Sequence, residues 1–309
     1  MNNRNGFVLV CVLWVLAILT VVTLGLGRRA LLDRRAAAYA LDRSQAMLMA
    51  RGAVHRGIAE VRNKAIVDEL SERDPGITHL GQPWARPQDM LKDGDIFRLG
   101  EAFEEDHVVY RIEDMERRIN VNRAPPELLE NIEALSRTAA RKIYARTRTG
   151  EQEGDPPAAF HTLEEIRHID GVSDEDWFGG RRKTGLQYLL TTWGDGRVNV
   201  NTASAEVLRS IPGMRAGDVD KIIAFRAGND GELGTGDDRG LKPLVNLVEL
   251  VGIRADTMEA IMRYCKYNSD LFKITGEATR RKGAVRVSCS AVVYFNGNVL
   301  AWQEESLGS

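Results

Sequence analysis

The feature that most constrains this chain is an uncharged run near its N-terminal end. From Phe7 to Gly27, 21 residues follow one another without Asp, Glu, Lys or Arg, and most of them are apolar. As an α-helix that rises about 1.5 Å per residue, this run is about 30 Å long, which is the thickness of a bilayer hydrocarbon core. The sequence therefore predicts one membrane-spanning helix at 7–27 that anchors a soluble body.

The residues in front of this run differ from those of an ordinary secretory signal. Arg4 is the only basic residue before Gly6, and no small-residue cleavage site follows the apolar run. A short polar leader that ends in Gly6-Phe7 resembles the leader of type IV pilins and of type II secretion pseudopilins. This resemblance implies that a prepilin peptidase removes residues 1–6 and that the new amino group of Phe7 is methylated. From the residues alone, an uncleaved single-span anchor stays open.

The charges around the span disagree with that resemblance about orientation. Arg4 stands alone in front of the span, whereas Arg28, Arg29, Arg34 and Arg35 follow it. The positive-inside rule therefore favours a cytoplasmic C-terminal body. The pilin resemblance implies the opposite. We follow the resemblance and expect a single-pass protein of the bacterial inner membrane with its body in the periplasm.

The remaining chain has the composition of a soluble body. Its length of 309 residues suffices for two domains beyond the anchor, and a net charge of −2 offers no strong basic field for nucleic acid. Cys11 lies in the predicted span, whereas Cys265 and Cys289 lie in the body. From the residues alone, these two cysteines either pair outside the cytoplasm or stay free and buried.

A helical pattern continues beyond the span, through the first part of 28–117. Small or apolar residues recur at three- and four-residue steps from Leu32 to Val61, and arginines occupy the other side. The pattern predicts one helix of about sixty residues, half in lipid and half amphipathic, that ends at Asp74-Pro75-Gly76.

Short strands are predicted on both sides of the middle of the chain. Alternating polar and apolar residues mark them at 95–99, 107–113, 271–278, 284–295 and 299–303. Asn296-Gly297, between the last two strands, predicts a tight type I′ hairpin. The strands of 28–117 and 268–309 would form one small antiparallel sheet packed on the helix. The fold class is then α+β, with a large insertion.

The insertion contains an internal repeat. The segment 118–129, RINVNRAPPELL, matches 197–208, RVNVNTASAEVL, at an offset of 79 positions. In each copy an asparagine, Asn122 or Asn201, precedes a predicted helix start and is expected to cap it. The repeat predicts two small all-α subdomains, 118–194 and 195–267.

This duplicated N-V-N-x-A-x-x-E-[LV]-L motif, set between a pilin-like helix and C-terminal strands, resembles the protein K family of type II secretion minor pseudopilins. The resemblance covers essentially the whole chain, and its two inserted subdomains would be of the SAM or helix-hairpin-helix type. Most pilins have a glutamate at the fifth mature position, where this chain has Cys11, and the lack of that glutamate is typical of protein K. The resemblance implies a structural subunit, not an enzyme, that caps the pseudopilus tip and helps to start its assembly for protein export. The implied partners are minor pseudopilins of the I and J types, the prepilin peptidase, the inner-membrane secretion platform and membrane lipid.

One acidic loop is a candidate calcium site. Residues 228–240 place four carboxylates, Asp230, Glu232, Asp237 and Asp238, among five glycines. Calcium prefers six to eight oxygen ligands, and glycine lets a backbone curl around the ion. The spacing is not that of an EF-hand, and the residues alone leave a solvated acidic loop equally open. The protein K resemblance implies calcium, which would order the loop.

A DNA-binding module anchored in the membrane is the alternative hypothesis. Residues 211–214, Ile-Pro-Gly-Met, resemble a helix-hairpin-helix turn and are followed by Arg215, a type of residue that contacts phosphate in such motifs. Asp218 and Asp220 beside the turn argue against it, and we expect no nucleic-acid partner. The five histidines are scattered, and neither H-E-x-x-H nor a P-loop occurs, so no catalytic residue is predicted.

Overall fold

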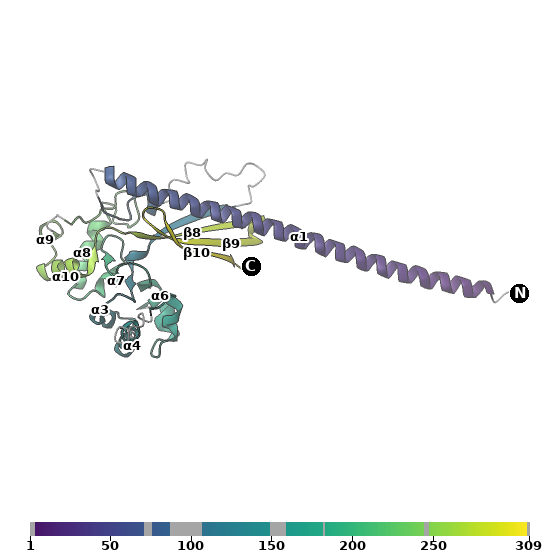
Figure 1. Ribbon diagram of the computed structural model, residues 1–309, viewed down its shortest axis with the longest axis horizontal. Coiled ribbons are helices and arrows are strands. Elements are labelled where there is room, and N and C mark those ends of the chain that lie inside the picture. Colours follow the sequence, from purple (N-terminus) through teal and green to yellow (C-terminus); the bar gives the residue numbers. More distant parts are fainter. Residues whose placement is uncertain are drawn as a thin grey trace.

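The computed structural model describes residues 4–70, 76–86, 107–148, 159–181, 183–243 and 247–307. A single helix, α1 (Arg4–Leu70), runs through the predicted span and continues into the body without a break. Among the described residues, one helix, at Leu9–Lys64, is long and apolar enough to cross a membrane. Figure 1 shows the first half of α1 standing clear of the body and the second half lying along the sheet. The predicted continuous helix is confirmed, whereas its predicted end at Asp74-Pro75 falls outside the described residues.

The second half of α1 packs on a four-stranded antiparallel sheet. β1 (His107–Asp114), β8 (Leu271–Arg280), β9 (Val285–Tyr294) and β10 (Val299–Leu307) lie side by side in this order. Alternate side chains of these strands point towards α1, as the two-residue period of a strand requires. Together with small residues of the helix they form one buried core, which includes Ala46, Ala50, Ala53, Phe272, Ile274, Val287 and Val293. The predicted α+β arrangement is confirmed. The strand predicted at 95–99 lies outside the described residues.

A glycine lets β8 approach the backbone of α1. A Cβ atom added at Gly276 would overlap the carbonyl oxygen of Ala50 and would lie 3.0 Å from the Cβ of Ala53. Because the obstacle is backbone, no side-chain rotation relieves the overlap. We expect Gly276→Ala to destabilise the folded chain by about 1–3 kcal/mol in denaturant titrations of the full chain in detergent.

Gly52→Ala is the matched control for that prediction, because it adds the same methyl group on α1, the helix that Gly276 approaches. A Cβ at Gly52 meets nothing within 4 Å. Alanine favours the helical conformation over glycine, so this variant should gain up to about 1 kcal/mol of stability. An equal loss in both variants would refute a specific close approach at Gly276.

The β9–β10 hairpin has a different turn from the predicted type I′. That turn needs a positive φ at both central residues, and of the pair Asn296-Gly297 only Gly297 has one, at 88°. The loop spans three residues, because the Tyr294 N–H donates to Asn298 O at 2.8 Å. Gly297 occupies the position of this three-residue loop that needs a positive φ. An Asn-Gly pair is therefore compatible with a three-residue loop as well as with a type I′ turn.

Two copies of a similar order of elements form the insert. The first copy contains β2 (Ile119–Asn120), α3 (Pro126–Glu130), α4 (Arg137–Arg148), η4 (Leu163–His168), α5 (Asp174–Phe178), β3 (Gly179–Gly180), β4 (Lys183–Thr184), α6 (Leu186–Leu189) and β5 (Leu190–Thr191). The second copy contains β6 (Val198–Asn199), α7 (Ala205–Arg209), α8 (Ala216–Arg226), α9 (Leu247–Leu250), α10 (Ala255–Tyr264) and β7 (Cys265–Lys266). Short parallel strand pairs close each copy, β2 on β5 and β6 on β7. The insert is therefore mainly helical, and the prediction of purely α-helical subdomains was wrong in this detail.

The two copies share one apolar core that is separate from the core of the sheet. Its members come from both copies and include Ile119, Leu129, Ile143, Val198, Leu208, Ile222 and Ile261. Short 3-10 turns, η1 (Pro83–Ala85), η3 (Met115–Arg117) and η5 (Arg281–Gly283), complete the described elements. The predicted subdomain limits, 118–194 and 195–267, stay predictions.

The two cysteines of the body are free and lie in different cores. Cys265 belongs to the insert core and Cys289 to the sheet core. Burial raises the pKa of the Cys265 thiol to about 12 and that of the Cys289 thiol to about 11. Of the two alternatives left open by the sequence, the structure therefore shows free, buried and unreactive thiols.

Candidate functional site

The first asparagine of each N-V-N motif folds back on its own strand end. The N–H of Asn122 donates to Asn120 Oδ1, and the N–H of Asn201 donates to Asn199 Oδ1, both at 2.9 Å. The amide nitrogen of Asn120 then donates to Gly194 O at 2.7 Å, directly before the second copy. The side chain of Asn120 thus stabilises the turn of its own motif and also connects this motif to the backbone at Gly194.

Asn199 uses the same geometry to join the insert to the sheet. Its amide nitrogen lies 3.2 Å from Thr78 O, 3.1 Å from Asp114 Oδ2 and 2.7 Å from Ser269 Oγ. Asp114 is the last residue of β1, and its buried carboxyl also accepts hydrogen bonds from the hydroxyls of Thr202 and Ser269. Asn199 and Asp114 therefore form a buried polar junction between the second copy and the edge of the sheet.

The second asparagine of each motif bridges to a distant backbone segment. Asn122 Nδ2 donates to Phe160 O at 3.0 Å, and Phe160 N–H donates back to Asn122 Oδ1 at 2.8 Å. Asn201 makes the equivalent pair with Leu241, at 3.0 and 2.7 Å, and also donates to Tyr267 O at 3.2 Å. These two-sided bridges explain why the motif requires an amide, which has a donor and an acceptor on one group.

The prediction that Asn122 and Asn201 cap the following helices was wrong. Helix α7 takes Ser204 as its N-cap, with Ser204 Oγ accepting from the Val207 N–H at 3.3 Å. Helix α3 follows Pro125, which offers no side-chain cap. Both asparagines stand three or more residues earlier, and their amides are occupied by the backbone bridges.

A buried ion pair reinforces the junction. Lys266 Nζ lies 2.7 Å from Glu116 Oε2, with only 8% and 2% of these side chains exposed. Asp195 and Asp270 lie further out, at 3.3 and 3.4 Å from the same ammonium group. Burial raises the pKa of Glu116, although Lys266 partly offsets this. Burial alone would lower the pKa of Lys266, but its hydrogen bond and charge interaction with Glu116 raise it.

Asp114 is a second buried carboxyl of this junction, as little exposed as Glu116. Burial raises its pKa, while the hydroxyls of Ser269 and Thr202 act in the opposite direction. Asp114, Glu116 and Lys266 stand in no recognisable motif. Their only sequence signal is that acidic residues directly follow the alternating pattern of β1 and a lysine closely precedes that of β8.

The acidic loop is closed by its own carboxylates. Asp237 Oδ2 accepts from the N–H groups of Asn229 (2.6 Å) and Asp230 (3.2 Å), and Asp237 Oδ1 accepts from the Thr235 hydroxyl (2.7 Å). The Thr235 hydroxyl and these N–H groups hold the pKa of Asp237 well below its usual range. Asp238 is buried, and its two oxygens accept from the backbone of Gly234 and Thr235.

The structure brings two of the four predicted calcium ligands together. The carboxyl of Asp237 also contacts that of Asp230, and two such groups side by side need a shared proton or a cation. The Glu232 side chain is exposed, and Asp238 is held by backbone donors. Across the described part of the chain, no three His, Cys, Asp or Glu side chains converge as a metal-binding group. The residues therefore fit a calcium ion as an Asp230–Asp237 pair and not as a set of four.

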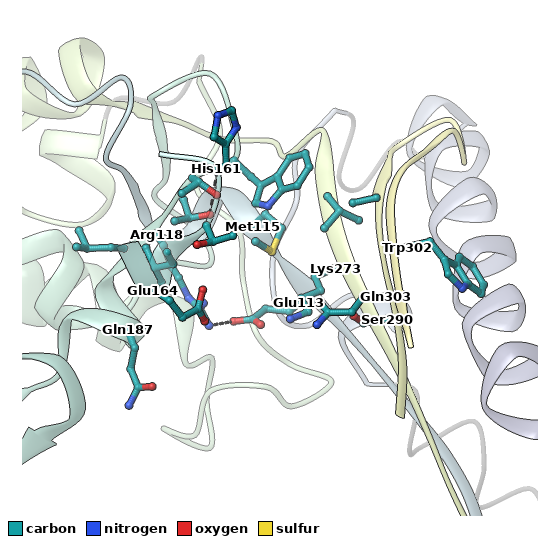
Figure 2. A pocket seen from close by; sticks show the side chains of 18 of the residues that line it. Glu113, Met115, Arg118, His161, Glu164, Gln187, Lys273, Ser290, Trp302 and Gln303 are labelled. Atoms are coloured by element: carbon teal, nitrogen blue, oxygen red, sulfur yellow. Dashed lines mark hydrogen bonds and ion pairs between the residues drawn. The ribbon is translucent and has the colours of Figure 1, made fainter. Parts of the chain in front are cut away.

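A cavity of about 550 Å³ separates the insert from the outer face of the sheet. Figure 2 shows Lys273, Ser290 and Gln303 on the sheet side and His161, Glu164 and Gln187 on the insert side. Arg118 and Glu113, which form an ion pair, also line the cavity, as does Met115 (Figure 2). This lining mixes both charges with hydroxyl, amide and indole groups, so it does not define one class of ligand.

The turn at 211–214 has the predicted hairpin shape, with Gly213 at a φ of 87°. The basic residues around it are already engaged. Arg215 pairs with Asp256 at 3.0 Å, and Arg254 pairs with the buried Asp218 at 3.3 Å. Guanidinium groups held by carboxylates are poorly placed to neutralise phosphates, so the geometry does not support the DNA-binding alternative.

The fold defines a class of protein. A continuous helix with an exposed apolar first part, which packs its second part on an antiparallel sheet, is the architecture of a membrane-anchored, pilin-like subunit. No family model matches the chain. A curated relative, type II secretion system protein K of Pseudomonas aeruginosa, is 28% identical over an alignment of 261 positions that covers 73% of each chain. The predicted resemblance is confirmed, because over this length the chain is similar to a type II secretion system protein K.

One solved structure is also similar. It is a chain of the GspK-GspI-GspJ complex from the type 2 secretion system of enterotoxigenic Escherichia coli. The match covers 81% of this chain and 94% of that chain, with 13% sequence identity and a TM-score of 0.47.

Proposed function

We propose that this chain is a minor pseudopilin that caps the tip of the type II secretion pseudopilus and helps to start its assembly for protein export. The observation that carries the proposal is the position of the insert, at the end of the sheet opposite the exposed half of α1 (Figure 1). In a fibre built from apolar helices packed side by side, an insert in this position covers the place that the next subunit would occupy. The chain therefore suits the end of a fibre better than its shaft.

The partners follow from the same architecture. The first half of α1 exposes large apolar side chains, which would pack against lipid and against the helices of minor pseudopilins of the I and J types. Cleavage between Gly6 and Phe7 by a prepilin peptidase, methylation of Phe7 and docking on the inner-membrane platform would precede assembly, with the body in the periplasm. Cys11 carries no charge that would need a partner in lipid, which suits a subunit with no neighbour above it.

Co-expression of the full chain with a prepilin peptidase and the other pseudopilins tests this proposal. Mass spectrometry should find a mature chain that begins at Phe7, and an antibody against the insert should label fibres at one end only. Cells without the peptidase are the control and should retain the leader. An intact leader beside active peptidase would contradict the pseudopilin class, and label along the shaft would contradict the tip role alone.

We also propose that calcium orders the loop at 228–240. The support is the proximity of the carboxyls of Asp230 and Asp237, whose residues are also joined by the Asp230 N–H donating to Asp237 Oδ2 at 3.2 Å. In the same loop, Asp238 already holds the backbone. Bound calcium would place a positive charge between these two carboxylates. Asp230 and Asp237 would hold the ion, and backbone carbonyls or water would complete its oxygen ligands.

Thermal melting of the full chain with and without calcium tests the loop site. Calcium at a hundredfold excess over its dissociation constant should stabilise the chain by about 2.7 kcal/mol. Asp230→Asn should abolish most of this gain, because asparagine keeps an acceptor for the Glu232 N–H (2.8 Å) but loses the charge. Glu259→Gln removes an exposed carboxylate on α10 and is the matched control. The lack of any calcium shift in the unmodified chain would refute the site and leave the tip role standing.

A further inference from the structure

A cluster of arginines follows the apolar run of α1 directly. Arg28, Arg29, Arg34 and Arg35, here called the arginine collar, are all exposed. None of them forms an ion pair within the described residues, and Asp33 is the only carboxylate between positions 28 and 41. The first acidic group that pairs along this helix is Asp42, whose carboxyl lies 2.6 Å from the Arg281 guanidinium. The collar therefore carries a net positive charge with no partner in the described fold.

With Gly27 at the edge of the hydrocarbon core, the collar lies within side-chain reach of the lipid headgroups. Arg35 stands eight residues beyond Gly27, which is about 12 Å along the helix axis. Each headgroup layer adds about 5–7 Å beyond the hydrocarbon core. Arginine side chains extend far enough to place their charge in that layer while their methylene groups lie along the helix. The body leaves this stretch of α1 uncovered (Figure 1). Among the side chains that the structure describes, residue 42 is the first buried one of the helix.

The directions of the four side chains distinguish lipid from a protein partner. At about 100° per residue, Arg28 and Arg35 lie within about 20° of each other around the helix. Arg29 lies about 100° to one side of Arg28, and Arg34 about 120° to the other. A neighbouring helix contacts one face, whereas headgroups surround the whole circumference.

We propose that the arginine collar binds the phosphate groups of anionic phospholipids and thereby fixes the depth of α1 in the membrane. A guanidinium group donates two parallel hydrogen bonds to one phosphate, and an anionic surface attracts each added basic residue. Headgroup phosphates are the matching acceptors because they are held in a plane at the depth of the collar. The collar would oppose movement of the helix along its axis in both directions, until assembly extracts it.

Native mass spectrometry of the full chain tests the collar. The chain is reconstituted in nanodiscs of equimolar phosphatidylglycerol and phosphatidylethanolamine. The protein is then released from the nanodisc in the mass spectrometer, and the lipid molecules of each kind that remain bound to it are counted. The unmodified chain should retain about five times as much phosphatidylglycerol as phosphatidylethanolamine, or more. A fivefold ratio is the effect expected of a single basic residue at an anionic surface. R28Q/R29Q/R34Q/R35Q should reduce this ratio to about one, since charge attraction is the source of the preference.

Two control variants accompany the experiment. The same four positions changed to lysine keep the charge and should keep most of the preference. R123Q/R137Q/R181Q removes three exposed arginines of the insert and should leave the ratio unchanged. Equal retention of both lipids by the unmodified chain would overturn the proposal. A glutamine variant that keeps its lipid preference but no longer co-purifies with other minor pseudopilins would also overturn it, and would assign the collar to a protein interface.

Discussion

Lys266→Met is expected to destabilise the folded chain by about 3–5 kcal/mol at neutral pH, because it removes the partner of a buried carboxylate. Glu116 is 2% exposed and lies 2.7 Å from the lysine, and it would keep its charge in a place with little water. The remaining donors are neutral: the Asp270 N–H lies 2.7 Å from Glu116 Oε2 and the Asp195 N–H 3.4 Å from Glu116 Oε1. Denaturant titration of the full chain in detergent measures the loss. Lys142→Met, which breaks an exposed pair with Asp170, is the matched control and should change stability by less than about 0.5 kcal/mol.

The loss in Lys266→Met should depend on pH in a defined direction. Burial already raises the pKa of Glu116 above its unfolded value, and removal of the lysine raises it further. Such a carboxyl favours the folded state below its unfolded pKa, and this contribution is lost as pH rises through the folded pKa. The destabilisation should therefore be largest at neutral pH and shrink as the solution is acidified. Glu116→Gln in the same background should remove this pH dependence, and a loss that stays constant with pH would show that the charge of Glu116 is not its cause.

Asn201→Ala is expected to cost about 3–5 kcal/mol, because it leaves two buried backbone groups without a partner. Its amide bonds both the carbonyl and the N–H of Leu241, and Asn201 is 1% exposed. The carbonyl of Tyr267, which Asn201 also contacts, keeps a second donor in the Thr78 N–H at 2.9 Å. Hydrogen exchange locates the effect, since the Leu241 amide should lose its protection before the sheet does. Asn122→Ala removes the equivalent bridge to Phe160 at a half-buried position, and it should cost less. Equal losses would show that burial does not set the cost.

Much of the fold could be predicted because it depends on regular patterns. The uncharged run and the three- and four-residue steps define α1, and alternation defines β1, β8, β9 and β10. The repeat locates both copies of the insert. The turn after β9 could not be predicted in type, because Asn-Gly suits a three-residue loop as well as a two-residue one.

The roles of the conspicuous side chains were harder to predict. The amides of Asn122 and Asn201 bond with partners 38 and 40 positions away, and local spacing suggested a helix cap. The junction of Asp114, Glu116 and Lys266 joins three separate segments, and no spacing of single polar residues indicates such a contact. The acidic loop was recognisable by composition, yet which of its carboxylates lie together depends on backbone turns at Gly228, Gly231 and Gly234.

The register of β1 against β8 has a consequence for the order of folding. Asp114 pairs with Phe272 although the entire insert lies between them in the chain. If the intervening segment were unstructured, closing so long a loop would be slow, and the unpaired strands would be exposed to aggregation. Once the insert has folded, its polar junction holds the two strand ends side by side, and only a short closure remains. The insert should thus act on nascent chains as an internal template, and lesions in it should appear first as slow or failed pairing of the sheet.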